Sequence, residues 1–129
     1  MSQSEKDLHS RLNVFVEMIK RKDVSLVDEL WGDGGFLMVG SEQGEICRTR
    51  AEVDAKLTAV FANPATLVFD WPKRTVTIVG SAAWIFAEGN LVLRRAGVAD
   101  VRRPYLALCI FENRDGKWHW RQFFGSEPA

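Results

Sequence analysis

The chain has 129 residues, enough for one domain spanning residues 1–129, and its 47% hydrophobic and 26% charged residues are typical of a globular protein rather than a disordered one. Lys plus Arg and Asp plus Glu both number 17, so the net charge is zero, and we expect no nucleic-acid partner, because such proteins normally carry a basic excess. No apolar run approaches the ~18 residues of a transmembrane helix, and the N-terminus has no apolar signal-peptide core, so we expect no membrane partner.

Two helices are predicted in the first 35 residues. The first has one apolar face, formed by Leu8, Leu12, Phe15, Val16 and Ile19. We expect Ser4 to cap it. A second, short helix is predicted to start at Ser25 and to end before the glycines at 32, 34 and 35.

A hairpin and a third helix follow. The segments FLMVGS and EICRT, separated by Gln43-Gly44, predict a small β-hairpin. Thr49 and Glu52 have the spacing of a capping box, which predicts a helix from Thr49 onward. Asn63-Pro64 ends this helix.

After Pro64 the pattern becomes extended and remains so. Segments rich in β-branched and aromatic residues are separated by Pro72-Lys73, by Gly80-Ser81, by the loop 94–103 and by Asp115-Gly116. They predict strands over 66–71, 75–79, 82–93, 104–112 and 117–124. Helices followed by strands predict an α+β fold, with helices on one face of a mostly antiparallel sheet.

Strand alternation suggests that this sheet has two different apolar faces. On strand 82–93, Trp84, Phe86 and Glu88 share one side, and on strand 104–112, Tyr105, Ala107, Cys109 and Phe111 oppose Leu106, Leu108 and Ile110. A strongly curved sheet cannot press its whole concave face against three helices, so the space between them either fills with side chains or forms a ligand cavity. A buried Glu88 would need a charged partner, and Arg121 is the candidate.

The motifs AAWIFAEG and CIFENRDGKWHWRQFFGSEP, with Trp118 and Ser126 eight residues apart, resemble the nuclear transport factor 2-like superfamily. MVGSEQGEICRTRAEV resembles the hairpin that leads into a helix in this superfamily. The likeness is in particular to its SnoaL-like and ketosteroid-isomerase-like domains and to the association domain of calcium/calmodulin-dependent kinase II. The resemblance implies a cone of three helices wrapped by a curved sheet of about six strands. It also implies a ligand cavity in the mouth of the cone and a homodimer packed through the sheet.

The expected ligand-binding residues follow from the alternation and from this resemblance. By similarity to the association domain of calcium/calmodulin-dependent kinase II, the cavity face is the one that carries Tyr105, Cys109, His119, Arg121 and Phe123. Two cavity arginines of that domain match Cys109 and Gly125 here, so its ligand preference cannot be transferred. The full expected set is Trp31, Trp84, Glu88, Tyr105, Cys109, His119, Arg121 and Phe123.

Three functions remain open on this sequence. The first is a small-molecule-binding domain whose ligand is apolar or aromatic, with or without a carboxylate, and is anchored by Arg121. The second is an isomerase, cyclase or dehydratase in which Glu88 or Asp70 is the base. The third is a purely associative dimerisation module with a vestigial cavity.

Neither a metal site nor a cofactor is indicated, because Cys47 and Cys109 stand apart from any cluster of ligand residues. The two lone cysteines predict a reduced, cytoplasmic protein. Four arginines, Arg94, Arg95, Arg102 and Arg103, bracket the loop GVAD. This charge indicates a solvated hairpin loop or, alternatively, an anion-attracting lip over the cavity or a partner contact.

Overall fold

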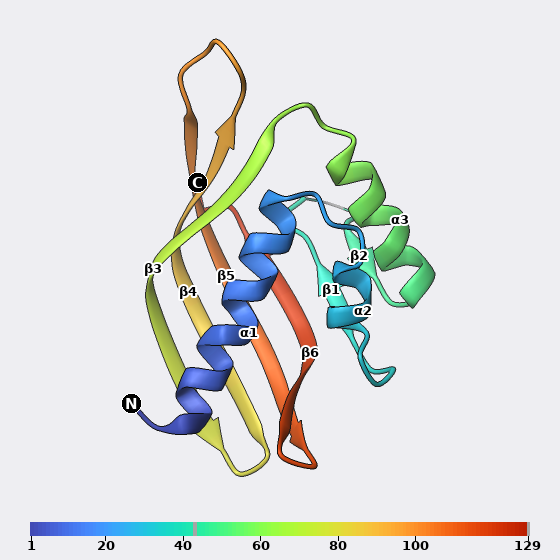
Figure 1. The fold of residues 1–129 in the computed structure, drawn as a ribbon, viewed down its shortest axis with the longest axis vertical. Helices are drawn as coiled ribbons and strands as arrows, with labels where there is room; N and C mark the ends of the chain where they lie inside the picture. The colour runs from blue at the N-terminus through green and yellow to red at the C-terminus, as the bar shows by residue number, and fades with distance from the viewer. Residues whose placement is uncertain (43, 129) are drawn as a thin grey trace.

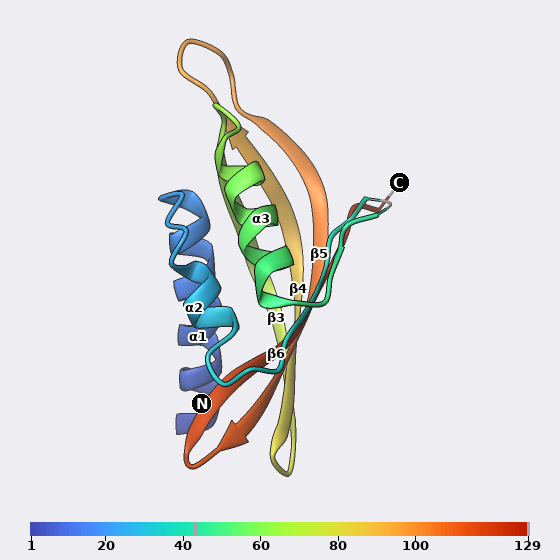
Figure 2. The ribbon, with the colours of Figure 1, turned by 90° about the vertical axis from the view of Figure 1, so that its right-hand side faces the viewer.

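The computed structural model describes residues 1–42 and 44–128, so Gln43 of the predicted hairpin turn lies outside the described residues. Its elements in chain order are α1 (Gln3–Lys20), α2 (Leu26–Leu30), β1 (Leu37–Val39), β2 (Ile46–Cys47), α3 (Arg50–Phe61), β3 (Thr66–Val79), β4 (Ala82–Arg94), β5 (Val101–Arg114) and β6 (Lys117–Ser126). The helices lie on one face of a strongly curved sheet (Figures 1 and 2), which confirms the predicted α+β cone. No helix in the described ranges is both long enough and apolar enough to cross a membrane.

Local capping explains where α1 and α3 begin. The hydroxyl of Ser2 accepts the backbone N–H of Glu5 at 3.1 Å, so Ser2 caps α1, and the prediction of Ser4 was wrong. The capping box of α3 is confirmed, since Thr49 accepts the Glu52 N–H at 3.1 Å and the Glu52 carboxylate accepts the Thr49 N–H at 3.1 Å.

The six strands form one sheet in the order β2-β1-β6-β5-β4-β3, and all neighbours are antiparallel except β1 and β6. Contrary to the prediction, Pro72-Lys73 does not divide β3. The strand continues through a bulge between Asp70 and Lys73. Since β3 is an edge strand, the missing N–H of Pro72 costs no pairing inside the sheet.

A second bulge, in β6, decides which side chains point inward. Ile110 pairs with Gln122 but Phe111 pairs with Trp120, so Arg121 is an extra residue without an opposite partner. Trp120 and Phe123 therefore both reach the buried concave face. The expectation that Arg121 shares a face with Phe123 is corrected, because a shift of one residue reverses the direction of each side chain.

The strands β4 and β5 place their small residues on the concave face. Ala83, Ile85 and Ala87 of β4 pair with Phe111, Cys109 and Ala107 of β5, and all six are buried. Trp84 pairs with Ile110, and Glu88 pairs with Leu106, on the opposite, convex face. Trp84 and Glu88 thus do not share the face of Tyr105 and Cys109, which corrects the expected cavity face of strand 82–93.

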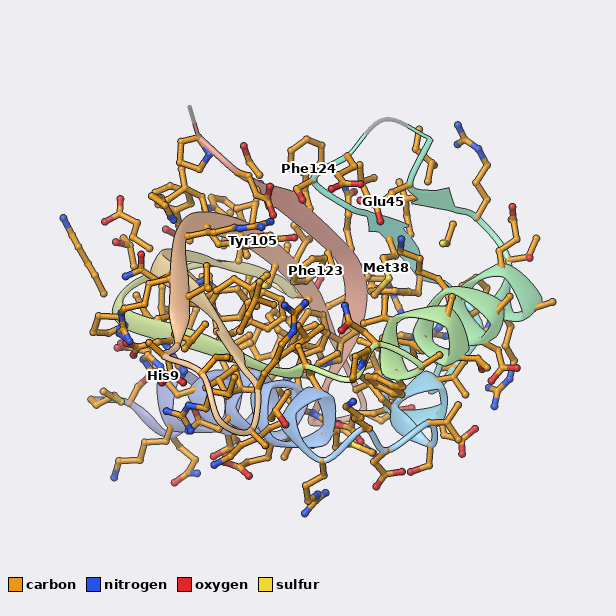
Figure 3. The ribbon with its side chains drawn as sticks, turned by 90° about the horizontal axis from the view of Figure 1, so that it is seen from above. His9, Met38, Glu45, Tyr105, Phe123 and Phe124 are labelled. Carbon is orange, nitrogen blue, oxygen red and sulfur yellow. The ribbon has the colours of Figure 1, made fainter. Side chains whose placement is uncertain are left out.

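Aromatic side chains fill the space between α1 and the sheet. The ring of Phe15 lies 5.1 Å from Phe123, 5.4 Å from Trp120 and 6.0 Å from Phe69 between ring centroids. In Figure 3, Tyr105 and Phe123 lie inside the curve of the sheet and Phe124 lies outside it. The core is therefore complete beside α1, while the end of the sheet that faces α3 carries a cavity.

Candidate functional site

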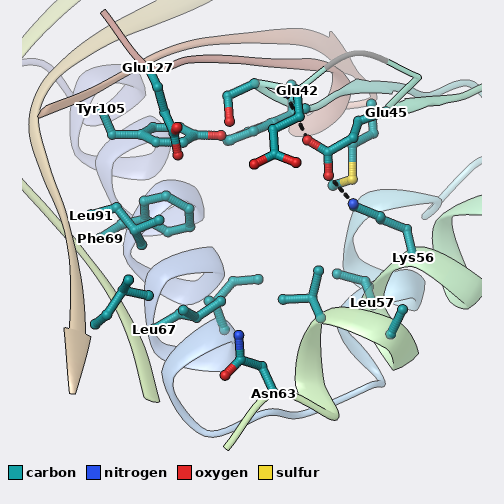
Figure 4. Close-up of a pocket in the computed structure, with 18 of the residues that line it drawn as sticks. Glu42, Glu45, Lys56, Leu57, Asn63, Leu67, Phe69, Leu91, Tyr105 and Glu127 are labelled. Carbon is teal, nitrogen blue, oxygen red and sulfur yellow. Dashed lines mark hydrogen bonds and ion pairs between the residues drawn. The ribbon is translucent and has the colours of Figure 1, made fainter. Parts of the chain in front are cut away.

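A cavity of about 390 Å³ lies between α3, the end of α1, the β1–β2 hairpin and the concave face of β3, β4 and β5. Its apolar wall comes from alternate residues of two neighbouring strands, Leu67 and Phe69 on β3 and Leu91 and Leu93 on β4. Leu57 of α3 faces them across the space (Figure 4). The cavity is thus lined mainly by aliphatic and aromatic side chains, as small-molecule sites usually are.

Tyr105 and Phe123 connect this cavity to the aromatic core. Tyr105 is 6% exposed, and its ring meets Phe69 edge-on at 5.1 Å. A Cβ on Gly125 would lie 2.0 Å from the Tyr105 hydroxyl oxygen, so a residue without a side chain is required there. Burial raises the pKa of Tyr105 to about 12, which keeps its hydroxyl a neutral hydrogen-bond donor at physiological pH.

Glu45 is held at the polar end of the cavity by its own hairpin. Its carboxylate accepts the backbone N–H of Glu42 at 2.8 Å and forms an ion pair with Lys56 of α3. A Cβ on Gly40 would lie 2.6 Å from the Glu45 carboxylate, so Gly40 allows this close approach. Figure 4 shows Glu45, Glu42 and Glu127 near Tyr105, with Asn63 at the opposite end.

Of the eight residues expected to bind ligand, Tyr105 and Phe123 line this cavity. Cys109 lies on the same concave face but is 0% exposed in the core, and burial raises the pKa of its thiol. Trp31 packs edge-on against Phe36 at 6.2 Å and does not line the cavity. Trp84 lies half-buried on the convex face.

The two carboxylates expected to act as bases lie in ion pairs away from the cavity. Glu88 is 3.3 Å from Lys73, and Asp70 is 2.7 Å from Arg102. Within residues 1–42 and 44–128, no three His, Cys, Asp or Glu side chains gather in a group that could hold a metal ion.

Arg121 and His119 belong to a separate charged cluster at the β5–β6 hairpin. Arg121 donates two hydrogen bonds to Asp33, at 2.6 and 2.8 Å, and one to Glu112 at 2.9 Å. His119 lies 3.8 Å from the same Asp33 carboxylate. The pairing of Arg121 with Glu88 expected from the sequence is therefore wrong, because Arg121 pairs with Asp33 in the loop after α2 and with Glu112 of β5. The pair with Asp33 holds that loop against the sheet.

Sequence reasoning missed Glu45, Lys56 and the leucines of the cavity wall. One signal was present, since Lys56 falls between Val53 and Val60 on the apolar stripe of α3 and is the polar exception there. The leucines required knowledge of strand register. Leu67 pairs with Leu93, which places them together on the concave face, and the sequence alone does not reveal this pairing.

Residues 8–129 match the family described as the SnoaL-like domain. The chain belongs to the SnoaL-like family. Its fold is that of the nuclear transport factor 2-like superfamily, as the resemblance predicted. No curated protein matches the chain.

Solved structures share the fold at low sequence identity. A "putative dehydratase" of the NTF2-like family from Streptomyces avermitilis has 19% identity and a TM-score of 0.80, covering 96% of this chain and 95% of its own. A "putative scytalone dehydratase" from Novosphingobium aromaticivorans has 8% identity and a TM-score of 0.81, covering 98% and 85%. An NTF2-like protein with a cystatin-like fold from the same organism has 15% identity and a TM-score of 0.76, covering 95% and 80%.

The charged cluster makes a prediction about acid stability. Hydrogen bonds from Arg121 are the main reason that the pKa of Asp33 falls from 3.8 to about 2. A carboxyl group with a lowered pKa in the folded state stabilises the fold above its unfolded pKa, and this contribution disappears as the pH falls to the folded value. Asp33→Asn should therefore lower Tm at neutral pH, and its difference from the wild type should shrink between about pH 5 and about pH 2.

Thermal unfolding followed by circular dichroism across this pH range tests the prediction. Asp54→Asn, which removes an exposed carboxylate from α3, is the matched control for the loss of charge. A wild-type advantage over Asp33→Asn that stays constant down to the lowest pH would contradict the role given to this pair.

Proposed function

We propose that this protein is a cytoplasmic, homodimeric small-molecule-binding protein that holds an apolar or aromatic ligand in the cavity between α3 and the sheet. The observation that supports this most strongly is the cavity of about 390 Å³, which has an apolar wall and a polar end. Domains of this fold commonly bind small molecules, which agrees with the proposal. The two buried, unpaired cysteines fit a reducing compartment.

The geometry favours binding over catalysis by Glu88 or Asp70. Both carboxylates lie outside the cavity in ion pairs, with Lys73 and Arg102. Glu45, which does line the cavity, is already engaged by Lys56 and by the N–H of Glu42. The open cavity also weighs against the purely associative alternative, for which a filled interior was expected.

Filling the cavity should weaken ligand binding without unfolding the protein. The neutral fluorescent probe phenylnaphthylamine should bind the wild type, and Leu91→Trp should weaken its binding by about tenfold, equivalent to about 1.4 kcal/mol of lost apolar contact. Fluorescence titration gives the Kd values, and circular dichroism verifies the fold. Overpacking of this kind typically costs about 1–3 kcal/mol of folding stability.

Val79→Trp is the matched control, because Val79 is 60% exposed at the far end of β3 and does not line the cavity. It should bind the probe as the wild type does. Equal Kd values for all three proteins would place the probe elsewhere and remove the support for a cavity ligand.

The convex face of the sheet is the proposed dimer surface. Phe86 pairs with Leu108, and Leu108 pairs with Phe124, so apolar side chains form a continuous row across β4, β5 and β6. Phe124 is 44% exposed, and no helix within residues 1–42 and 44–128 lies on this side of the sheet (Figure 2). A second copy would cover an apolar surface that is unusual on a monomer.

Light scattering should give twice the monomer mass for the wild type. Leu108→Arg should give the monomer mass, because a dimer of this variant would bury an unpaired charge at the interface. Val14→Arg, on the exposed side of α1, is the control and should remain dimeric. A monomeric wild type at micromolar concentration, or a Leu108→Arg dimer of unchanged affinity, would exclude this surface.

A further inference from the structure

The four arginines around the β4–β5 loop divide into two pairs. Arg94 and Arg102 have internal acidic partners, since Arg94 lies 3.4 Å from Asp100 and Arg102 lies 2.7 Å from Asp70. Neither lines the cavity. These two arginines are therefore accounted for by the loop and the edge of the sheet.

Arg95 and Arg103 have a different environment. Both line the cavity, and both are exposed at its mouth. Among the described residues, neither has an acidic side chain within ion-pair distance. Arg103 is two residues from Tyr105 and pairs in register with Leu91, so it lies at the edge of the apolar wall.

Acidic side chains also line this cavity. Glu42 and Glu127 lie near Tyr105, while the charge of Glu45 is compensated by Lys56 (Figure 4). An anionic group would be repelled from Glu42 and Glu127 and attracted to Arg95 and Arg103. The cavity lining thus carries both signs of charge, and this can fix where an anionic group of the ligand lies.

We propose that the ligand is amphipathic and acidic, with its apolar body against Leu67, Phe69 and Leu91 and one anionic group held by Arg95 and Arg103. A carboxylate or a sulfonate has the geometry that suits the planar guanidinium fork. This inference rests on the proposed function of the cavity. It adds the chemical class of the ligand and the two residues that select it.

Two fluorescent probes with a common skeleton test the selection directly. Anilinonaphthalene sulfonate carries the anionic group, and phenylnaphthylamine is the same molecule without it. In the wild type, the sulfonate should bind more tightly than the neutral probe, and added salt should reduce this difference, because charges at an exposed mouth are screened. Each of Arg95→Gln and Arg103→Gln should weaken sulfonate binding by about fivefold, the scale of one exposed charge pair, and leave the neutral probe unaffected.

The matched control is the double variant Arg94→Gln/Arg102→Gln, compared with Arg95→Gln/Arg103→Gln. Both double variants remove two positive charges from the same hairpin, so a long-range effect of net charge would change them equally. We expect only the cavity-lining pair to lose the preference for the sulfonate. Arg103→Lys should retain part of it, because the charge remains while the fork is lost.

The outcomes separate this inference from the proposed function. Normal binding of the neutral probe together with unchanged sulfonate binding in Arg95→Gln/Arg103→Gln would overturn the anion site and leave the cavity function intact. An equal loss in the two double variants would overturn it too. Failure of both probes to bind the wild type would contradict the cavity function, and the anion site with it.

Discussion

The whole arrangement depends on a curved sheet whose concave face is covered by the helices. Along α1 the gap between helix and sheet is closed by large aromatic residues, among them Phe15, Trp120 and Phe123, which belong to one buried core with Ala87 and Ala107. At the other end, the cavity lies between α3, the β1–β2 hairpin and the concave face of the sheet. The same curvature that buries the core thus leaves the cavity.

The charged residues of this fold serve two separate purposes. At the β5–β6 hairpin, Arg121 and Asp33 satisfy each other and hold the loop after α2, so this guanidinium is occupied. At the cavity mouth, Arg95 and Arg103 have no such internal acid among the described residues. A charge that the protein has already paired contributes to the fold, whereas one left unpaired beside an apolar wall is available to a ligand.

The sequence predicted features that depend on local chemistry. The capping box at Thr49, the apolar face of α1 and the order of helices and strands are all encoded within a few residues, and the structure confirms them. The family motifs in β4 and in the β5–β6 hairpin are also short, local stretches of sequence, and they predicted the fold. Tyr105 and Phe123, which were expected on the cavity face, line the cavity.

The rest depends on pairing between distant strands. The bulge at Arg121 inserts one residue into the alternation, and the face expected for Arg121 was therefore reversed relative to Phe123. The facing of β4 is set by its register with β5, which places Trp84 opposite Ile110 rather than on the concave side. No local pattern encodes a bulge or a register, so the position of the cavity wall could not be predicted from the sequence.

The most direct test of this account is the location of a bound probe at atomic resolution. Nuclear Overhauser effects between phenylnaphthylamine and the methyl groups of the isotope-labelled protein arise only where the probe and a methyl group lie close together, roughly at the distance of a side-chain contact. The account predicts contacts to Leu57, Leu67 and Leu91 inside the cavity. Contacts confined to Leu106, Leu108 and Ile110 on the convex face would contradict it.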